Sequence, residues 1–254
     1  MIEQSYSILA QVSGLTAFIS ICIGFLLGAI VLVKAIKTKQ KIIFFFFLCI
    51  IFTLSPWYPS GGGYIYWLLS GSPLPYEWYI IIGLAGIPIA ILAWLDVYMT
   101  TINPEKKNLV LTIFLIFSLV FEFWIFFNLY LATGAPIRSV LGVFNNPDNL
   151  MDIDYKSFTL IYLASCIGIA VATGIHFALK SIKLKRNDEL IWKGKFLFVA
   201  FILFGVAATF DAMIDLGVVL LVIIRLVLMA TTFFFYLGFI LPKWAKRALN
   251  IEVE

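Results

Sequence analysis

The chain of 254 residues is 63% hydrophobic and 13% charged, and its mean hydropathy is +1.04. Soluble globular domains carry a charged share of about 25%, so the composition excludes a water-soluble globule and predicts an all-α protein that crosses a bilayer several times. The formal net charge of +4 does not indicate a nucleic-acid partner, because the Lys and Arg residues stand in short connections and not in one basic arm.

Seven apolar stretches, taken in chain order, predict a seven-helix transmembrane bundle. A bilayer core of about 30 Å needs about 20 apolar residues per helix. No basic segment precedes the first stretch, which favours a retained helix over a cleaved signal peptide. The second stretch is interrupted at Ser55-Pro56, so we expect a short helix or a kinked one that continues toward Tyr64. The stretches are about 9–33, 42–58, 78–100, 109–131, 158–181, 195–216 and 218–241, within one transmembrane domain over residues 1–254.

Basic residues predict the orientation of the bundle. They follow the first, third, fifth and seventh stretches, whereas the alternate connections hold only Arg138 and Lys156. Short cytoplasmic connections carry the excess of Lys and Arg, so we expect the N-terminus outside and the C-terminus inside a plasma membrane. Little of the chain is left for an aqueous catalytic domain, and we expect no enzyme and no cofactor.

Two connections on the expected outer side are unusual. Residues 56–78 are dense in Pro, Gly, Tyr and Trp, which is typical of a non-helical segment with aromatic anchors at the interface; a lid over an outward pocket is the alternative. Residues 133–155 contain NNPDNLMDID but lack the glycine and terminal Glu of an EF-hand. We interpret this second connection as a solvated loop.

Charged side chains inside the apolar stretches are the candidate functional residues. Ionisable groups in hydrocarbon are costly unless they are paired. Asp211 and Arg225 flank the turn between the last two stretches at similar depth, and Glu122 lies near the same level. We therefore expect a Glu122–Arg225–Asp211 cluster. Asp215 lies one helical turn from Asp211 and is expected nearer to water. The cluster is either a structural ion cluster or a site for a proton, a cation or a polar ligand.

Two further ionisable residues are secondary candidates. His176 is the single histidine, so it cannot build a zinc site alone; a hydrogen-bonded core histidine is favoured over a proton switch. Asp96 lies near the inner end of the third stretch and is expected at the interface rather than in a relay. No metal site is predicted.

The end of the last stretch carries the one family resemblance. Residues 236–247 read YLGFILPKWAKR, which resembles the exit of the last transmembrane helix in multi-span sensor regions of prokaryotic histidine kinases. Arg225 also resembles a basic position of those regions. The resemblance implies a sensor module, and because no coiled coil or kinase follows Arg247, the signal would pass to a separate partner.

These patterns support one main hypothesis and two alternatives. The main hypothesis is a stand-alone seven-helix sensor or receptor-like module in the lipid bilayer, with a signalling partner bound at residues 180–195 or at the C-terminal tail. The alternatives are a small secondary transporter or proton-coupled carrier, and a structural or assembly subunit. The last stretch has no lysine for a retinal Schiff base, which argues against a retinal photoreceptor or pump of the microbial rhodopsin kind.

Overall fold

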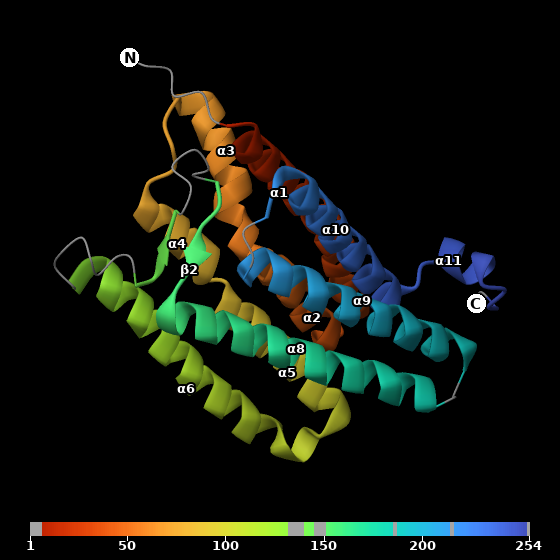
Figure 1. The fold of residues 1–254 in the computed structure, drawn as a ribbon. Coiled ribbons are helices and arrows are strands. Elements are labelled where there is room, and N and C mark those ends of the chain that lie inside the picture. The colour runs from red at the N-terminus through yellow and green to blue at the C-terminus, as the bar shows by residue number, and fades with distance from the viewer. Residues whose placement is uncertain (1–6, 132–139, 145–150, 185–186, 214–215, 253–254) are drawn as a thin grey trace.

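The structure is a computed structural model that describes residues 7–131, 140–144, 151–184, 187–213 and 216–252 (Figure 1). Helices dominate it. They are α1 (Ile8–Thr38), α2 (Lys41–Thr53), η1 (Ser55–Trp57), α3 (Tyr58–Ser70), α4 (Tyr76–Leu84), α5 (Ile87–Ile102), η2 (Pro104–Lys106), α6 (Lys107–Phe126), η3 (Phe127–Leu131), α8 (Ser157–Lys183), α9 (Asp188–Met213), α10 (Val218–Ile240) and α11 (Lys243–Ala248). Two short strands, β1 (Gly142–Val143) and β2 (Asp154–Tyr155), form an antiparallel hairpin.

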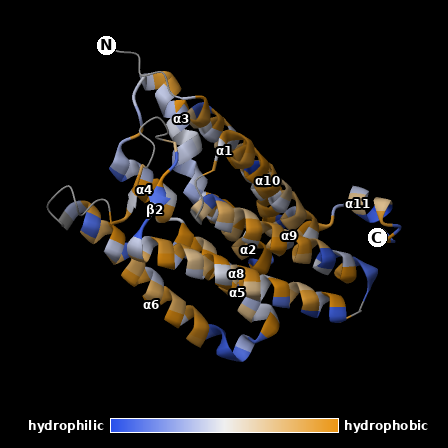
Figure 2. Cartoon of the chain, viewed as in Figure 1, coloured by the Kyte–Doolittle hydropathy of each residue, from blue (hydrophilic) through white to orange (hydrophobic). Residues whose placement is uncertain are grey.

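Seven helical segments of the described chain are long and apolar enough to cross a membrane. They are Ile8–Thr38, Lys41–Ser70, Tyr76–Ile102, Pro104–Tyr130, Ser157–Lys183, Asp188–Ala212 and Val218–Ile240. The predicted all-α, seven-span architecture is therefore confirmed, which fits a multi-pass membrane protein. Hydropathic colouring shows apolar residues along the helices and polar residues toward their ends (Figure 2).

The second and third spans are both interrupted, and their interruptions meet. The second is built from α2, η1 and α3, with Pro56 at the start of η1. The third breaks between α4 and α5, just before Pro88. A Cβ atom on Gly86 would lie 2.8 Å from the Cβ of Ser55, so glycine allows the two breaks to touch. A proline lacks the amide hydrogen that continues a helix, which explains why both breaks lie beside one.

The segment expected to be non-helical is helical over most of its length. Tyr58–Ser70 forms α3, which continues the second span and packs against α1. A Cβ atom on Gly61 would lie 2.8 Å from the backbone nitrogen of Phe18, so the glycine brings the two helices into close contact. The Gly-rich sequence thus serves helix packing rather than a loop, and the kinked continuation is the alternative that the structure adopts.

The hairpin of β1 and β2 corrects the interpretation of residues 133–155 as a solvated loop for the described parts, 140–144 and 151–155, whereas the rest of this connection lies outside the described residues. Met151, Ile153 and Tyr155 are buried. Tyr76 of α4 donates a hydrogen bond to the carbonyl of Gly142, 2.9 Å away. Residues 151–155 therefore fold inward, close to α4 and to α9 (Figure 1).

The two sides of the bundle differ in charge. We call the side with Ile8, the hairpin and the α9–α10 connection the hairpin side, and the opposite side, with α11, the basic side. On the basic side, Oε2 of Glu189 accepts a hydrogen bond from Nζ of Lys246 in α11 at 2.5 Å. Oε1 of the same residue forms a salt bridge with Nζ of Lys193 at 2.6 Å. The first turn of α9 is thereby joined to α11.

Candidate functional site: a buried polar cluster at the end of a cavity

Arg225 is the most deeply buried charged residue that the structure describes. It lies on α10 with 1% of its surface exposed, and its Nη2 atom is 3.4 Å from Oδ1 of Asp211. Its Cζ atom lies 5.7 Å from the centre of the Trp57 ring. The Nε and Nη1 atoms have no hydrogen-bond partner among the described residues. The expected pairing of Arg225 with Asp211 is confirmed.

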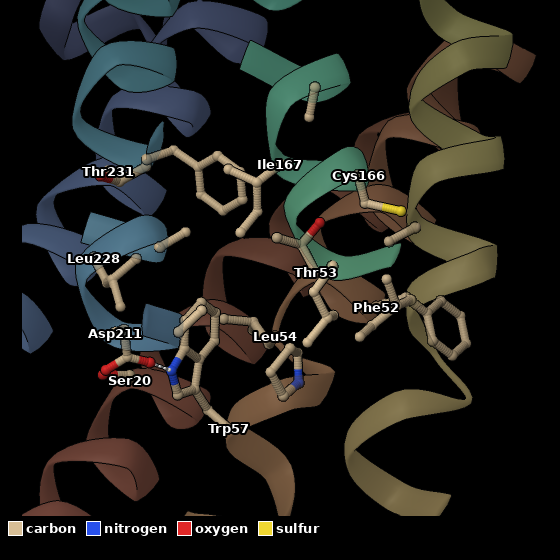
Figure 3. Close-up of a pocket in the computed structure, with 18 of the residues that line it drawn as sticks. Ser20, Phe52, Thr53, Leu54, Trp57, Cys166, Ile167, Asp211, Leu228 and Thr231 are labelled. Carbon is tan, nitrogen blue, oxygen red and sulfur yellow. Dashed lines mark hydrogen bonds between the residues drawn. The ribbon is translucent and has the colours of Figure 1, made fainter. Parts of the chain in front are cut away.

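Asp211 joins three elements of the fold. It lies in the last turns of α9 with 14% of its side chain exposed, and its Oδ2 atom accepts a hydrogen bond from Nε1 of Trp57 at 2.6 Å (Figure 3). Trp57 belongs to η1, so the interruption of the second span places this indole beside the ion pair. The carboxylate thus connects α9 to α10 and to the kinked second span.

Asp152 adds a second carboxylate that the sequence analysis did not select. It precedes β2, accepts a hydrogen bond from the amide of Ile153 at 3.1 Å, and lines the same cavity as Asp211 and Arg225. Burial and the negative charges of Asp211 and Asp154 together raise the pKa of Asp152 to about 7, although Arg225 opposes the rise. Asp152 therefore lies within electrostatic range of the Arg225–Asp211 pair, and its carboxyl gains or loses its proton near neutral pH.

Hydrogen bonds from the third span hold the Asp152 segment in place. The hydroxyl of Tyr79 donates to the carbonyl of Met151 at 3.1 Å and lies 2.9 Å from Oγ of Ser60. The ring of Tyr79 also packs edge-on against Phe144. Tyr155 is buried beside the cluster, and its pKa is raised by burial and by the charges of Asp152 and Asp211. The hairpin is thus fixed to α4 next to the ion pair.

The polar cluster closes one end of a mostly apolar cavity of about 160 Å³. The lining begins at Asp152, Asp211 and Arg225 and extends between the spans to Phe46, Trp94 and Phe235, which lie well inside their helices. Figure 3 shows part of this lining, with Trp57 and Asp211 at one end and Thr53, Cys166 and Thr231 farther along. The cavity therefore has a charged end and an apolar body.

Glu122 does not join the cluster, so this part of the prediction is wrong. It lies half-buried on α6, and it forms no salt bridge with Arg225 in the described structure. The helix α6 packs against α5 and α8 at the edge of the bundle opposite α10 (Figure 1). Similar depth along the bundle did not imply proximity, because the two helices are not neighbours. Asp215 lies outside the described residues.

The two secondary candidates lie elsewhere. Nδ1 of His176 is 2.8 Å from the hydroxyl of Tyr98, and the ring is exposed on the surface of α8, which contradicts the expected core position. Asp96 is buried near the basic side and forms a salt bridge with Lys107 at 2.6 Å. Neither lines the cavity.

A sequence signal for Asp152 does exist. Met-Asp-Ile-Asp-Tyr at 151–155 alternates apolar and acidic residues, and this period of two is typical of a strand with one buried face. The acidic residues led to the interpretation as a solvated loop, whereas the apolar ones decide the local structure. The alternation predicts a strand but cannot predict which carboxylate lies near Arg225.

The fold and this site define a seven-helix, multi-pass membrane protein with a buried ionic cluster. No protein-family model matches the chain, and no curated protein matches it either. Within the described ranges, no group of three or more His, Cys, Asp or Glu side chains is placed to hold a metal ion. The functional argument therefore depends on the geometry of the cluster and the cavity.

Proposed function

We propose that the protein is a receptor-like sensor of a prokaryotic plasma membrane, with the hairpin side outside and the basic side in the cytoplasm. In this proposal, protonation of Asp152 or binding of a ligand beside it changes how α9 packs against α10. The observation that carries the proposal is the buried Arg225, which pairs with Asp211 and acts electrostatically on Asp152. A cluster in which a guanidinium pairs with one carboxylate and lies near a second, titrating carboxyl can exist in two charge states within one fold.

The proton-dependent step depends on the groups that face Asp152. When its carboxyl is neutral, Asp211 and Arg225 form a neutral pair; when it ionises, the cluster carries a net charge of about −1. Low dielectric makes such a change large in energy. The facing groups are Asp211 of α9, Arg225 of α10, Asp154 and Tyr155 of β2, and Tyr79 of α4.

A path from this site to the basic side runs along α9. Its far end carries Glu189, which is bonded to Lys246 of α11. A shift of α9 against α10 would alter this contact and thereby the surface of residues 180–195 and of the C-terminal tail, where we propose that a cytoplasmic partner binds. The lining of the cavity reaches Phe46, Trp94 and Phe235 but not the residues of the basic side, and a cavity that does not cross the bundle supports a receptor over a transporter.

Spin labels can test the proposed movement. We would substitute cysteine for exposed Asp188 and Lys243 in a variant without native cysteines, reconstitute it in lipid nanodiscs, and measure the distance between the labels by pulsed electron resonance at pH 5.5 and pH 8.5. The expected result is a change in the distance distribution between the two pH values, because Asp152 titrates between them. This change should disappear in Asp152→Asn.

Asp154→Asn is the matched control. It removes the same charge two residues away, from a carboxylate that is 3.6 Å from Lys156 and less buried than Asp152. The pH-dependent change in distance should persist in this variant. Identical distances at both pH values in the unsubstituted chain, or a change that survives Asp152→Asn, would contradict the proposed sensing step.

A further inference from the structure

Arg225, which lines the cavity, has two buried hydrogen-bond donors that no described side chain uses. Nη2 faces Asp211, while Nε and Nη1 have no partner in the described part of the chain. The residue is almost fully buried and lines the cavity. Buried N–H groups of a cation are nearly always paired, so these donors point to an acceptor that enters the cavity.

The cavity body limits the shape of such an acceptor molecule. Phe46 and Trp57 both line it and are eleven positions apart in the chain, which corresponds to roughly 16 Å along a helix. A volume of about 160 Å³ over that length makes a narrow channel. An apolar cavity of about 150 Å³ holds a molecule of the size of benzene. The space therefore fits a short, unbranched chain better than a wide ring system.

Charge balance limits the head group. The Arg225–Asp211 pair is already neutral when Asp152 holds its proton, so a bound carboxylate would add an unbalanced buried charge. An ammonium group could balance an ionised Asp152, but it would leave the Arg225 donors unpaired and would be repelled by them. An uncharged oxygen acceptor pairs with the donors and adds no charge.

We propose that the cavity binds a short, unbranched apolar molecule that ends in an uncharged carbonyl oxygen, with this oxygen hydrogen-bonded to Nε or Nη1 of Arg225 and the chain directed toward Phe46. This inference rests on the proposed function and names the ligand class of the same site. Apolar molecules reach such a site through the lipid, so a receptor of this kind senses a compound dissolved in or crossing the membrane.

The test compares four probes with the same chain length, close to benzene in size: 2-hexanone, n-hexane, hexanoate and n-hexylamine. Each is titrated into the full chain in nanodiscs, with empty nanodiscs as the blank, and binding is followed by the rise in thermal unfolding temperature. 2-Hexanone labelled with ¹³C at the carbonyl also reports the head group directly, because a hydrogen bond to a cation moves this resonance to higher frequency.

Three variants accompany the probes. Arg225→Met keeps an unbranched side chain but removes the donors. Ala90→Leu narrows the apolar body without touching the cluster. Lys107→Met removes a cation near the basic side, remote from the cavity, and is the matched control.

We expect saturable binding of 2-hexanone that is at least tenfold tighter than binding of n-hexane, hexanoate or n-hexylamine. Arg225→Met and Ala90→Leu should each weaken it at least tenfold, and Lys107→Met should leave it unchanged. Equal binding of the ketone and the alkane, tightest binding of a charged probe, or undiminished ketone binding in Arg225→Met with an unshifted ¹³C resonance would overturn the proposal. If these binding results fail while the pH-dependent label distance persists, the ligand class is wrong and the proton-sensing function stands.

Discussion

Replacing Asp152 with Asn should change the pH dependence of stability in a direction that the structure dictates. The pKa of this carboxyl rises from its ordinary value of 3.8 to about 7 in the folded chain, so the folded state binds the proton more tightly than the unfolded state. The stability that this provides is complete below about pH 4 and is lost as the pH rises to about 7. Asn is neutral at every pH, so the Asp152→Asn protein should retain this stability at high pH.

The size of the effect follows from the same pKa. A difference of about 3 pH units at 1.4 kcal/mol each corresponds to about 4 kcal/mol at pH 8.5. For a chain of this length, 1 kcal/mol shifts the unfolding temperature by about 2–4 °C, so Asp152→Asn should unfold roughly 8–16 °C higher than the unsubstituted protein at pH 8.5. At pH 4 the two proteins should unfold at similar temperatures.

Intrinsic fluorescence during heating in nanodiscs measures this difference across the pH range. Asp154→Asn serves again as the control, and it should follow the unsubstituted protein because this carboxylate is more exposed and pairs with Lys156. If the Asp152→Asn protein is no more stable than the unsubstituted one at pH 8.5, or gains equally at pH 4, then the carboxyl is not held in a low-dielectric site and the reasoning is refuted.

Three further predictions concern the same structure. Arg225→Leu leaves Asp211 without its cation and should lower the free energy of unfolding by about 3–5 kcal/mol. Arg225→Leu combined with Asp211→Leu should lower it by less. Equal decreases in unfolding temperature for the single and double variants would show that the two charges do not depend on each other. Gly61→Ala forces α3 away from the α1 backbone and should lower the free energy of unfolding by about 1–3 kcal/mol. The added methyl group of Gly62→Ala meets nothing within 4 Å, so this substitution should raise the free energy of unfolding by about 0.5–1 kcal/mol. Similar unfolding temperatures for the two variants would refute the close contact. Tyr79→Phe removes the hydrogen bond to the Met151 carbonyl and should cost about 1–3 kcal/mol, with faster hydrogen exchange in residues 151–155; unchanged exchange would show that this bond does not hold the hairpin.

The sequence alone was sufficient to determine the membrane architecture. Transfer of each side chain into lipid is a largely local property that adds up along a stretch, so hydropathy locates the seven spans to within a few residues at most boundaries. The helix break at Pro56 was predicted from the missing amide hydrogen of proline, whereas the break near Pro88, in a stretch expected to be one helix, was not. Arg225 and Asp211 could also be paired from the sequence, because a tight turn makes the last two helices neighbours and sets their relative depth.

Only the tertiary structure decided which other groups share the site. Glu122 and Asp152 both lie at plausible depth, but proximity to Arg225 depends on which helices are neighbours and on how each is rotated. Packing of large side chains over the whole bundle sets these two properties, and no local pattern in one stretch contains them. The structure therefore puts Asp152 beside Arg225 and leaves Glu122 on α6, because contacts between residues distant in the sequence, and not depth in the bilayer, determine the composition of a buried cluster.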